Sequence, residues 1–181
     1  AAILGLEQDA VIECCKEASD IGIVEPANFN CPGQIVISGE VKAVEKAMEL
    51  ATQKGAKRAM MLAVSAPFHC SMLKPAGEKL AAELEKITLN DMQIPVVANV
   101  TGEYVKDKNL VKDLLIRQVS STVKMEDSLR NMIADGVDTF IEIGPGKALC
   151  GFLKKIDKTV NALNVEDMES LNNTLEKLGK L

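Results

Sequence analysis

The segment VSAPFHC, residues 64–70, contains the only histidine of the chain, His69. An imidazole titrates near neutral pH, so His69 could act as a general base that activates a nucleophile. It follows a segment that reads as a strand, and catalytic groups of α/β proteins tend to lie where strands end. The alternative is a partly buried histidine whose two nitrogens bond to backbone groups. The sequence alone leaves both interpretations open.

The nucleophile that such a base would serve is not apparent. Cys70 is adjacent to His69, but neighbouring residues on an extended segment point to opposite sides. We therefore interpret Cys70 as a small buried hydrophobic residue, and Cys31, in a Pro-Gly turn, in the same way. Ser38 and Ser71 lack the flanking glycines of a G-x-S-x-G nucleophile elbow. The chain shows a candidate base without its nucleophile.

The segment IGPGKAL, residues 143–149, lies between an expected strand and an expected helix, where phosphate-binding loops occur. It does not match a P-loop, because Ile141 stands where the first glycine is required and Ala148 replaces the serine or threonine. It also lacks the third small residue of G-x-G-x-x-G. We interpret it as a tight turn whose backbone N–H groups point outward from the start of a helix.

Two asparagines, Asn28 and Asn30, form a second candidate group in the segment NFNCPGQ. In an extended segment, residues two apart lie on the same face, so both amides could hold a polar substrate. The alternative is turn chemistry before Pro32, and it stays open at this point.

Composition argues against several classes of function. The chain has 181 residues, of which 47% are hydrophobic and 26% charged, so it can bury a sizeable core. A net charge of −5 and only 3% aromatic residues argue against binding to nucleic acids or anionic membranes. Five cysteines without a C-x-x-C pair argue against a disulfide framework or a zinc site and favour a cytoplasmic location. No charge-free stretch is long enough to cross a bilayer.

The first part of the chain follows the order β-α-β-β-α-β. Strands are expected at residues 1–5, 22–30, 33–39 and 57–64, and helices at 7–19 and 40–55. This is the split βαβ pattern, and it predicts a ferredoxin-like subdomain at residues 1–63. In its first helix, Val11, Ile12, Cys15 and Ala18 are expected to share one face.

The second part, residues 64–181, alternates helices with strands. Helices are expected at 71–87, 109–118, 124–135 and 166–179 and after the Gly-Pro-Gly turn, and strands at 94–100, 137–144 and 160–164. Such alternation predicts a parallel or mixed sheet covered by helices, so the fold class is α/β. The chain begins without Met and inside an expected strand, so we interpret it as a portion of a longer protein.

Several segments together resemble the malonyl-CoA:acyl-carrier-protein transacylase family over essentially all 181 residues. They are NFNCPGQIVISG, GAKRAMMLAVSAPFHCSMLKPA, PVVANVTG and RQVSSTVKMEDSLRNMIADGVDTFIEIGPGKALCGFLKKI. The combination of PGQxVISG, VSxPFH and EIGPGK is highly specific. The resemblance implies an α/β-hydrolase-like core with an inserted ferredoxin-like subdomain, in agreement with the pattern at residues 1–63. Residues 64–181 would then be the C-terminal portion of the acyltransferase core.

The resemblance also implies a reaction and roles for five residues. A serine takes malonyl from malonyl-CoA, and the phosphopantetheine thiol of acyl carrier protein then accepts it, without a cofactor. His69 would be the base, with its ring oriented by a backbone carbonyl at Gln118. Asn28 and Asn30 would line the pocket, and Phe68 would crowd the position that an α-methyl group needs.

The chain departs from the family pattern in two ways. Thr122 and Met125 replace a proline and a tryptophan, which could loosen the packing near Gln118. The family's GHSxGE nucleophile, its oxyanion segment and the arginine that pairs with the malonyl carboxylate have no counterpart here. We therefore expect the chain to be inactive by itself, and to need the N-terminal segment of the same enzyme.

The expected partners are this N-terminal segment, malonyl-CoA and acyl carrier protein, with no nucleic acid and no membrane. Two alternatives remain: a polyketide-synthase-type acyltransferase with another extender unit, and a non-catalytic ferredoxin-like ligand-binding module.

Overall fold

The computed structural model describes residues 1–179, which fall into two compact units, one of residues 1–128 and one that begins at Leu129. Both units combine helices with strands, so the α/β class expected from the sequence is confirmed. The expected boundary between residues 63 and 64 stays a prediction.

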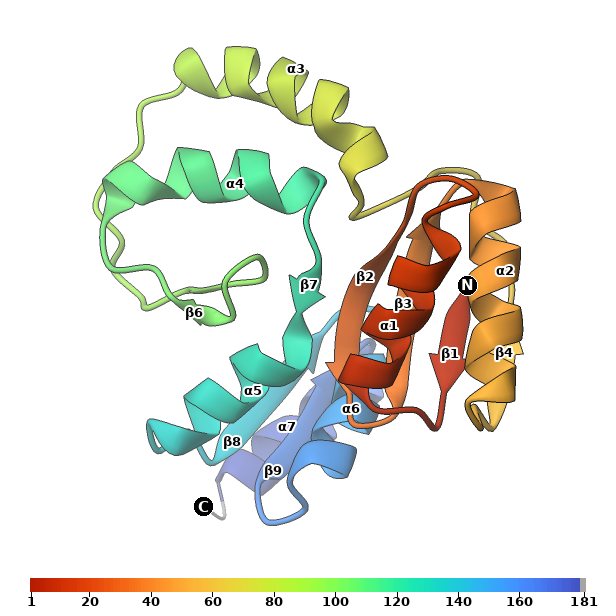
Figure 1. Cartoon of the computed structure of the whole chain (residues 1–181). Coiled ribbons are helices and arrows are strands. Elements are labelled where there is room, and N and C mark those ends of the chain that lie inside the picture. The colour runs from red at the N-terminus through yellow and green to blue at the C-terminus, as the bar shows by residue number, and fades with distance from the viewer. Residues whose placement is uncertain (180–181) are drawn as a thin grey trace. The chain divides into compact units, whose positions relative to one another are not determined.

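A five-stranded sheet with the order β4-β1-β3-β2-β7 lies in the first unit (Figure 1). The pairs β1–β3, β1–β4 and β2–β3 are antiparallel, and β2–β7 is parallel. The strands are β1 (Ala2–Leu4), β2 (Val24–Cys31), β3 (Gln34–Gly39), β4 (Arg58–Met60) and β7 (Val123–Lys124), and the helices packed against them are α1 (Gln8–Ala18) and α2 (Val41–Gln53).

The core of this sheet follows from the alternation of its strands and the spacing of its helices. On β3, Ile35 and Ile37 are each 1% exposed and face the helices, as a period of two requires. The buried residues of α1 are Val11, Cys14, Cys15 and Ala18. The expectation for Ile12 was wrong, because its side chain is 43% exposed. Consecutive helical residues are about 100° apart, which turns Ile12 away from a face centred on positions 11, 15 and 18.

Residues 61–128 add two packed helices and a short hairpin. The elements are the 3₁₀-helix η1 (Ser71–Leu73), α3 (Lys74–Glu85), β5 (Val97–Ala98), β6 (Glu103–Tyr104), the 3₁₀-helix η2 (Lys108–Leu110) and α4 (Val111–Val119). A side-chain carbon added at Gly77 of α3 would lie 3.3 Å from the carbonyl oxygen of Ile116 on α4, so the glycine permits close packing. The strands expected at 57–64 and 94–100 are shorter than predicted.

The pairing of β7 with β2 brings together two parts of the chain that are far apart in sequence. Asn28 pairs with Val123, and Phe29 pairs with Lys124. As a result, the segment that follows α4 lies beside the strand that carries the candidate asparagines. A strand of two residues carries no periodic signal, so β7 could not be predicted from a local pattern.

The second unit contains a parallel strand pair and two further helices. The helix α5 (Met125–Ala134) leads into β8 (Thr139–Ile143), α6 (Ala148–Ile156), β9 (Asn161–Val165) and α7 (Met168–Leu178). The pairing of β8 with β9 runs from Thr139 opposite Asn161 to Ile143 opposite Val165. Among the described residues, no helix is long and apolar enough to cross a membrane.

Candidate active site

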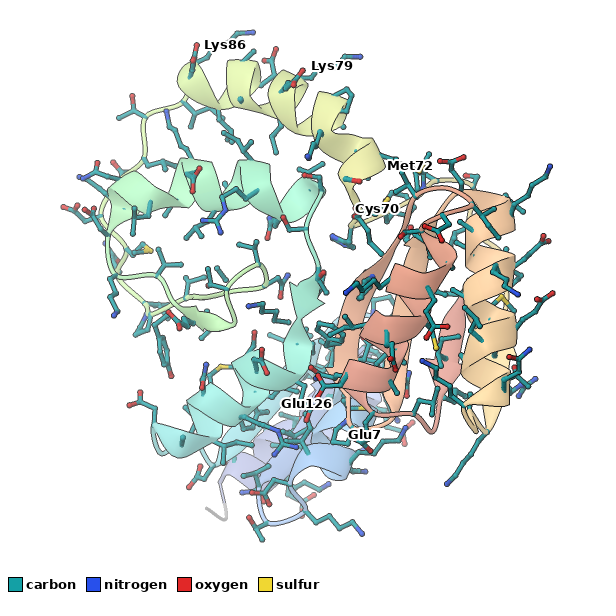
Figure 2. The ribbon with its side chains drawn as sticks, viewed as in Figure 1. Glu7, Cys70, Met72, Lys79, Lys86 and Glu126 are labelled. Atoms are coloured by element: carbon teal, nitrogen blue, oxygen red, sulfur yellow. The ribbon has the colours of Figure 1, made fainter. Side chains whose placement is uncertain are left out.

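His69 lies in the turn that connects β4 to η1, and its backbone is in the left-handed region with φ of 59°. It is the only residue other than glycine with positive φ in the described part of the chain. Such a conformation costs about 1–3 kcal/mol and persists only where the surroundings hold it. Cys70 and Met72, which follow His69 in the chain, lie between the five-stranded sheet and α3 (Figure 2).

The ring of His69 is held by a backbone carbonyl. Its Nδ1 lies 3.0 Å from the carbonyl oxygen of Gln118, in the last turn of α4, where carbonyl groups lack partners within the helix. Because a carbonyl oxygen only accepts hydrogen bonds, Nδ1 must carry the proton. In the neutral ring, Nε2 then has a free lone pair, and it has no hydrogen-bond partner among residues 1–179.

Phe68 and Asn28 border the same hollow, which has a volume of about 430 Å³ and is mostly apolar. Ser38 and Met72 also line it. Phe68 is 53% exposed, so its ring is available to a molecule that enters the hollow. Gln118 borders a separate hollow of about 390 Å³ near α4. The structure therefore groups Asn28 with Phe68, and Gln118 with His69.

Asn30 does not line the hollow that Asn28 borders. The pairing of β2 with β3 shifts register between Phe29 and Cys31, so Asn30 is an extra residue without a cross-strand partner. A second shift lies between Pro26 and Asn28. These bulges interrupt the regular alternation from which a shared face was expected, and a binding role for Asn30 stays a prediction.

The departure at Thr122 has a structural counterpart. The Thr122 hydroxyl donates a hydrogen bond of 2.7 Å to the carbonyl oxygen of Pro26 on β2. This bond ties the segment after Gln118 to the sheet, next to the β2–β7 pairing. A specific hydrogen bond is therefore present where the sequence suggested looser packing.

Sequence reasoning missed a contact at the C-terminal end of the turn that contains His69, residues 61–70, which is called the His69 turn below. Ser71 donates from its backbone N–H to Oε2 of Glu25 and from its hydroxyl to Oε1, and both bonds are 2.7 Å long. Glu25 is the only charged residue between Asp20 and Glu40. This isolated charge on a strand was the one signal that could have identified it.

The cysteines do not supply an activated nucleophile. All five cysteines are buried. Burial raises the pKa of Cys15 to about 12, and it also raises the pKa of Cys14 and of Cys150. The Cys70 thiol is fully buried and donates to the carbonyl oxygen of Pro67 at 3.3 Å. Because the thiolate is the reactive form, buried thiols of this kind are inert.

At the Gly-Pro-Gly-Lys turn, residues 144–147, and the start of α6 that follows it, backbone N–H groups donate hydrogen bonds to carboxylates of the protein itself. Glu142 accepts hydrogen bonds from the N–H groups of Leu149 (3.1 Å) and Cys150 (2.8 Å), and Glu166 accepts one from Gly146 (2.9 Å). Desolvation acts to raise the pKa of Glu142, but the N–H groups of Cys150 and Leu149 outweigh it and hold the pKa below its ordinary value. Carboxylates thus already fill the anion-binding position at this helix start.

Among the described residues, no cluster of three or more His, Cys, Asp or Glu side chains could hold a metal ion.

Comparison with known proteins gives a consistent set of similarities. The acyl transferase domain family matches residues 2–174. The chain is 45% identical over 179 residues to the malonyl CoA-acyl carrier protein transacylase of Bacillus subtilis (strain 168), with 98% of this chain and 56% of that protein covered.

Two solved structures are also similar. The malonyl CoA-acyl carrier protein transacylase from Clostridium perfringens matches with a TM-score of 0.96 and 53% identity, over 99% of this chain and 56% of that one. A malonyl-transacylase in complex with its type II polyketide synthase acyl-carrier protein matches with a TM-score of 0.94 and 41% identity, over 97% and 57%. The chain thus spans just over half the length of these relatives.

Proposed function

The chain belongs to the acyl transferase domain family, and on this premise we propose that it is the C-terminal portion of a malonyl-CoA:acyl carrier protein transacylase. The observation that carries the proposal is the contact between His69 Nδ1 and the Gln118 carbonyl oxygen, at 3.0 Å. It holds the imidazole in the tautomer whose Nε2 can accept a proton. No acidic side chain is needed to orient the ring, because the carbonyl does so.

The reaction proceeds in two half-reactions on one serine of the preceding segment. Nε2 of His69 takes the serine proton as the serine oxygen attacks the thioester carbonyl of malonyl-CoA, and the imidazolium returns that proton to the departing CoA sulfur. In the second half-reaction, Nε2 takes the proton of the phosphopantetheine thiol. The thiolate attacks the malonyl-serine ester, and the serine oxygen regains the proton. No cofactor takes part, since the thioester itself supplies the activated acyl group.

The fold supports a finer description as well. We propose that residues 1–63 form a ferredoxin-like subdomain. Their order β-α-β-β-α-β, with β1 and β2 parallel and β3 between them, supports this proposal. We take residues 64–181 as the C-terminal portion of the hydrolase-like core.

The hollow that Asn28 and Phe68 border is the proposed acyl pocket. A binding role for Asn30 is proposed from the family resemblance alone. The Asn28 amide would bind a polar group of the substrate, and the Phe68 ring would exclude an α-methyl substituent. Acyl carrier protein is the proposed partner, as in the related complex with a polyketide carrier protein. The enzyme would work in the cytoplasm, in fatty-acid biosynthesis.

A labelling experiment tests this proposal. The 181-residue chain is incubated with radiolabelled malonyl-CoA, alone and joined to the part of the Bacillus subtilis transacylase that it does not match. We expect no stable label on the chain alone, and label on a serine of the joined protein that passes to acyl carrier protein. His69→Ala should abolish this labelling, whereas Cys70→Ala, at the adjacent residue, should retain it.

Other outcomes would favour the alternatives. Stable label on the isolated chain would show that it carries its own nucleophile. Joined protein that turns over methylmalonyl-CoA faster than malonyl-CoA would indicate a polyketide-type acyltransferase with another extender unit. Joined protein that folds, binds ligand and transfers nothing would indicate a binding module.

A further inference from the structure

We propose that Glu25 is a positioning residue for His69, which acts by holding Ser71 and thereby the left-handed turn that presents the imidazole. The inference rests on the proposed function of His69 as the base. It assigns a role to a side chain on β2 that lies 44 positions before the histidine and does not touch the reacting atoms.

Glu25 binds Ser71 through hydrogen bonds to both of its carboxylate oxygens. Oε2 accepts the backbone N–H of Ser71 and Oε1 accepts its hydroxyl, each at 2.7 Å. Hydrogen bonds to a charged acceptor are about twice as strong as neutral ones, and two bonds to one residue also fix its orientation. Ser71 is only two residues after His69, so few backbone torsions separate the bonds to Glu25 from the imidazole of His69.

Ser71 also opens η1, and the start of this helix has no cap of its own. Its N-cap residue is Cys70, whose side chain makes no capping bond and donates to Pro67 instead. The first N–H groups of a helix need an acceptor from elsewhere. Glu25 supplies it from a distant strand, and η1 and α3 thereby begin at a fixed place relative to β2.

The contacts form a closed circuit around the histidine. The His69 ring bonds to Gln118, and Thr122, four residues further on, bonds to the Pro26 carbonyl. Pro26 follows Glu25, which bonds to Ser71, which returns the circuit to His69. A residue with positive φ costs free energy and needs surroundings that determine its conformation. The circuit provides this constraint from both sides of the turn.

The single histidine makes the inference testable by NMR on the full 181-residue chain, without any activity. The imidazole ¹⁵N signals report which nitrogen carries the proton, and only one set of signals exists. We expect wild-type signals of a ring protonated at Nδ1. Glu25→Gln retains the size of the side chain but offers one acceptor oxygen for two donors. It should shift the signals toward a mixture of tautomers and broaden them.

Asp107→Asn is the matched control. Asp107 caps the start of η2 by accepting the Asn109 N–H at 2.8 Å, so the same type of carboxylate is changed at the same type of helix start. The Asp107→Asn variant should leave the imidazole signals of His69 unchanged. Ser71→Ala, which removes one of the two bonds, should give a smaller shift and keeps the test valid if Glu25→Gln unfolds. The double variant Glu25→Gln/Ser71→Ala should shift the imidazole signals no further than Glu25→Gln alone, because both substitutions disrupt the same contact between Glu25 and Ser71.

Kinetics of the joined protein give a second, separate measurement. Glu25→Gln should lower kcat about tenfold with little change in KM, since small misplacements of a catalytic group cost rate rather than binding. Imidazole signals in Glu25→Gln identical to those of the wild type would overturn the inference and leave the proposed function standing. Full turnover by His69→Ala would instead overturn the proposed function.

Discussion

The His69 turn, residues 61–70, and the Gly-Pro-Gly-Lys turn, residues 144–147, both connect a strand to a helix and both suggest chemistry in the sequence. Their hydrogen bonds differ in kind. In the first turn, Gln118 accepts from one ring nitrogen and Glu25 accepts from the Ser71 backbone, while the other ring nitrogen has no hydrogen-bond partner within residues 1–179. In the second, carboxylates of nearby residues accept the outward N–H groups.

The comparison shows that two strand-to-helix turns can differ in whether a polar group is left available to a ligand, which their motifs do not reveal. The second turn lies between a strand and a helix, where phosphate-binding loops occur, but Glu166 accepts the Gly146 N–H, and Glu142 accepts the Leu149 and Cys150 N–H groups at the start of α6. The first turn contains no recognised glycine motif. Its partners come from 44 positions before and 49 positions after His69, and they fix the ring while leaving Nε2 free.

Replacing His69 with Ala should have the largest effect, because it removes the free group on which the comparison depends. In the joined protein, kcat for transfer to acyl carrier protein should fall by about 10²–10⁴-fold, the usual contribution of a general base. Steady-state kinetics measure the change, with circular dichroism to verify the fold. A loss of less than about threefold would remove the distinction between the two turns.

Replacing Phe68 with Ala should change selectivity rather than rate. Phe68 is 53% exposed and borders the same hollow as Asn28. Removing the ring should raise the ratio of kcat/KM for methylmalonyl-CoA to that for malonyl-CoA about tenfold, in the range typical for one methyl group in a pocket. An unchanged ratio would show that the ring does not contact the α-position.

Replacing Glu142 with Gln should reduce stability without a direct effect on chemistry. One carbonyl oxygen would replace two that accept the Leu149 and Cys150 N–H groups, a loss of about 1 kcal/mol, as for other helix caps. Denaturant unfolding of the variant and the wild type measures this difference in the free energy of unfolding. Because the folded-state pKa of Glu142 is lowered from 4.5, its stabilisation is present above pH 4.5 and lost as the pH falls through the folded value. The difference between variant and wild type should therefore shrink in acid, and a pH-independent difference would contradict this.

Replacing Lys147 with Ala should have the smallest effect. Its ammonium lies 3.5 Å from Glu166, and the Lys147 side chain is 62% exposed. Exposed pairs contribute between about 0 and 1 kcal/mol, so we expect a change below about 0.5 kcal/mol in the free energy of unfolding. A larger loss would mean that the lysine, and not only Glu142, holds the second turn together.

Local patterns predicted much of the fold and part of the site. The strand and helix order of residues 1–60 was predicted because periods of two and 3.6 are visible in short windows. The exposure of Ile12 and the short β7 were not, because the exact centre of a helical face and a two-residue pairing depend on neighbours. The bulge at Asn30 likewise arises from pairing with β3, which no local pattern of β2 encodes.

The family and the α/β class could be inferred from the sequence alone, since motif order and spacing are properties of the chain, and the same motifs predict His69 as the base. Some of the contacts around the histidine, however, have no pattern in the sequence. The family resemblance already implied the Gln118 carbonyl beside the ring, whereas the bonds between Glu25 and Ser71 depend on how β2 packs beside the turn. Such contacts join residues more than 40 positions apart. They exist only after the sheet has formed.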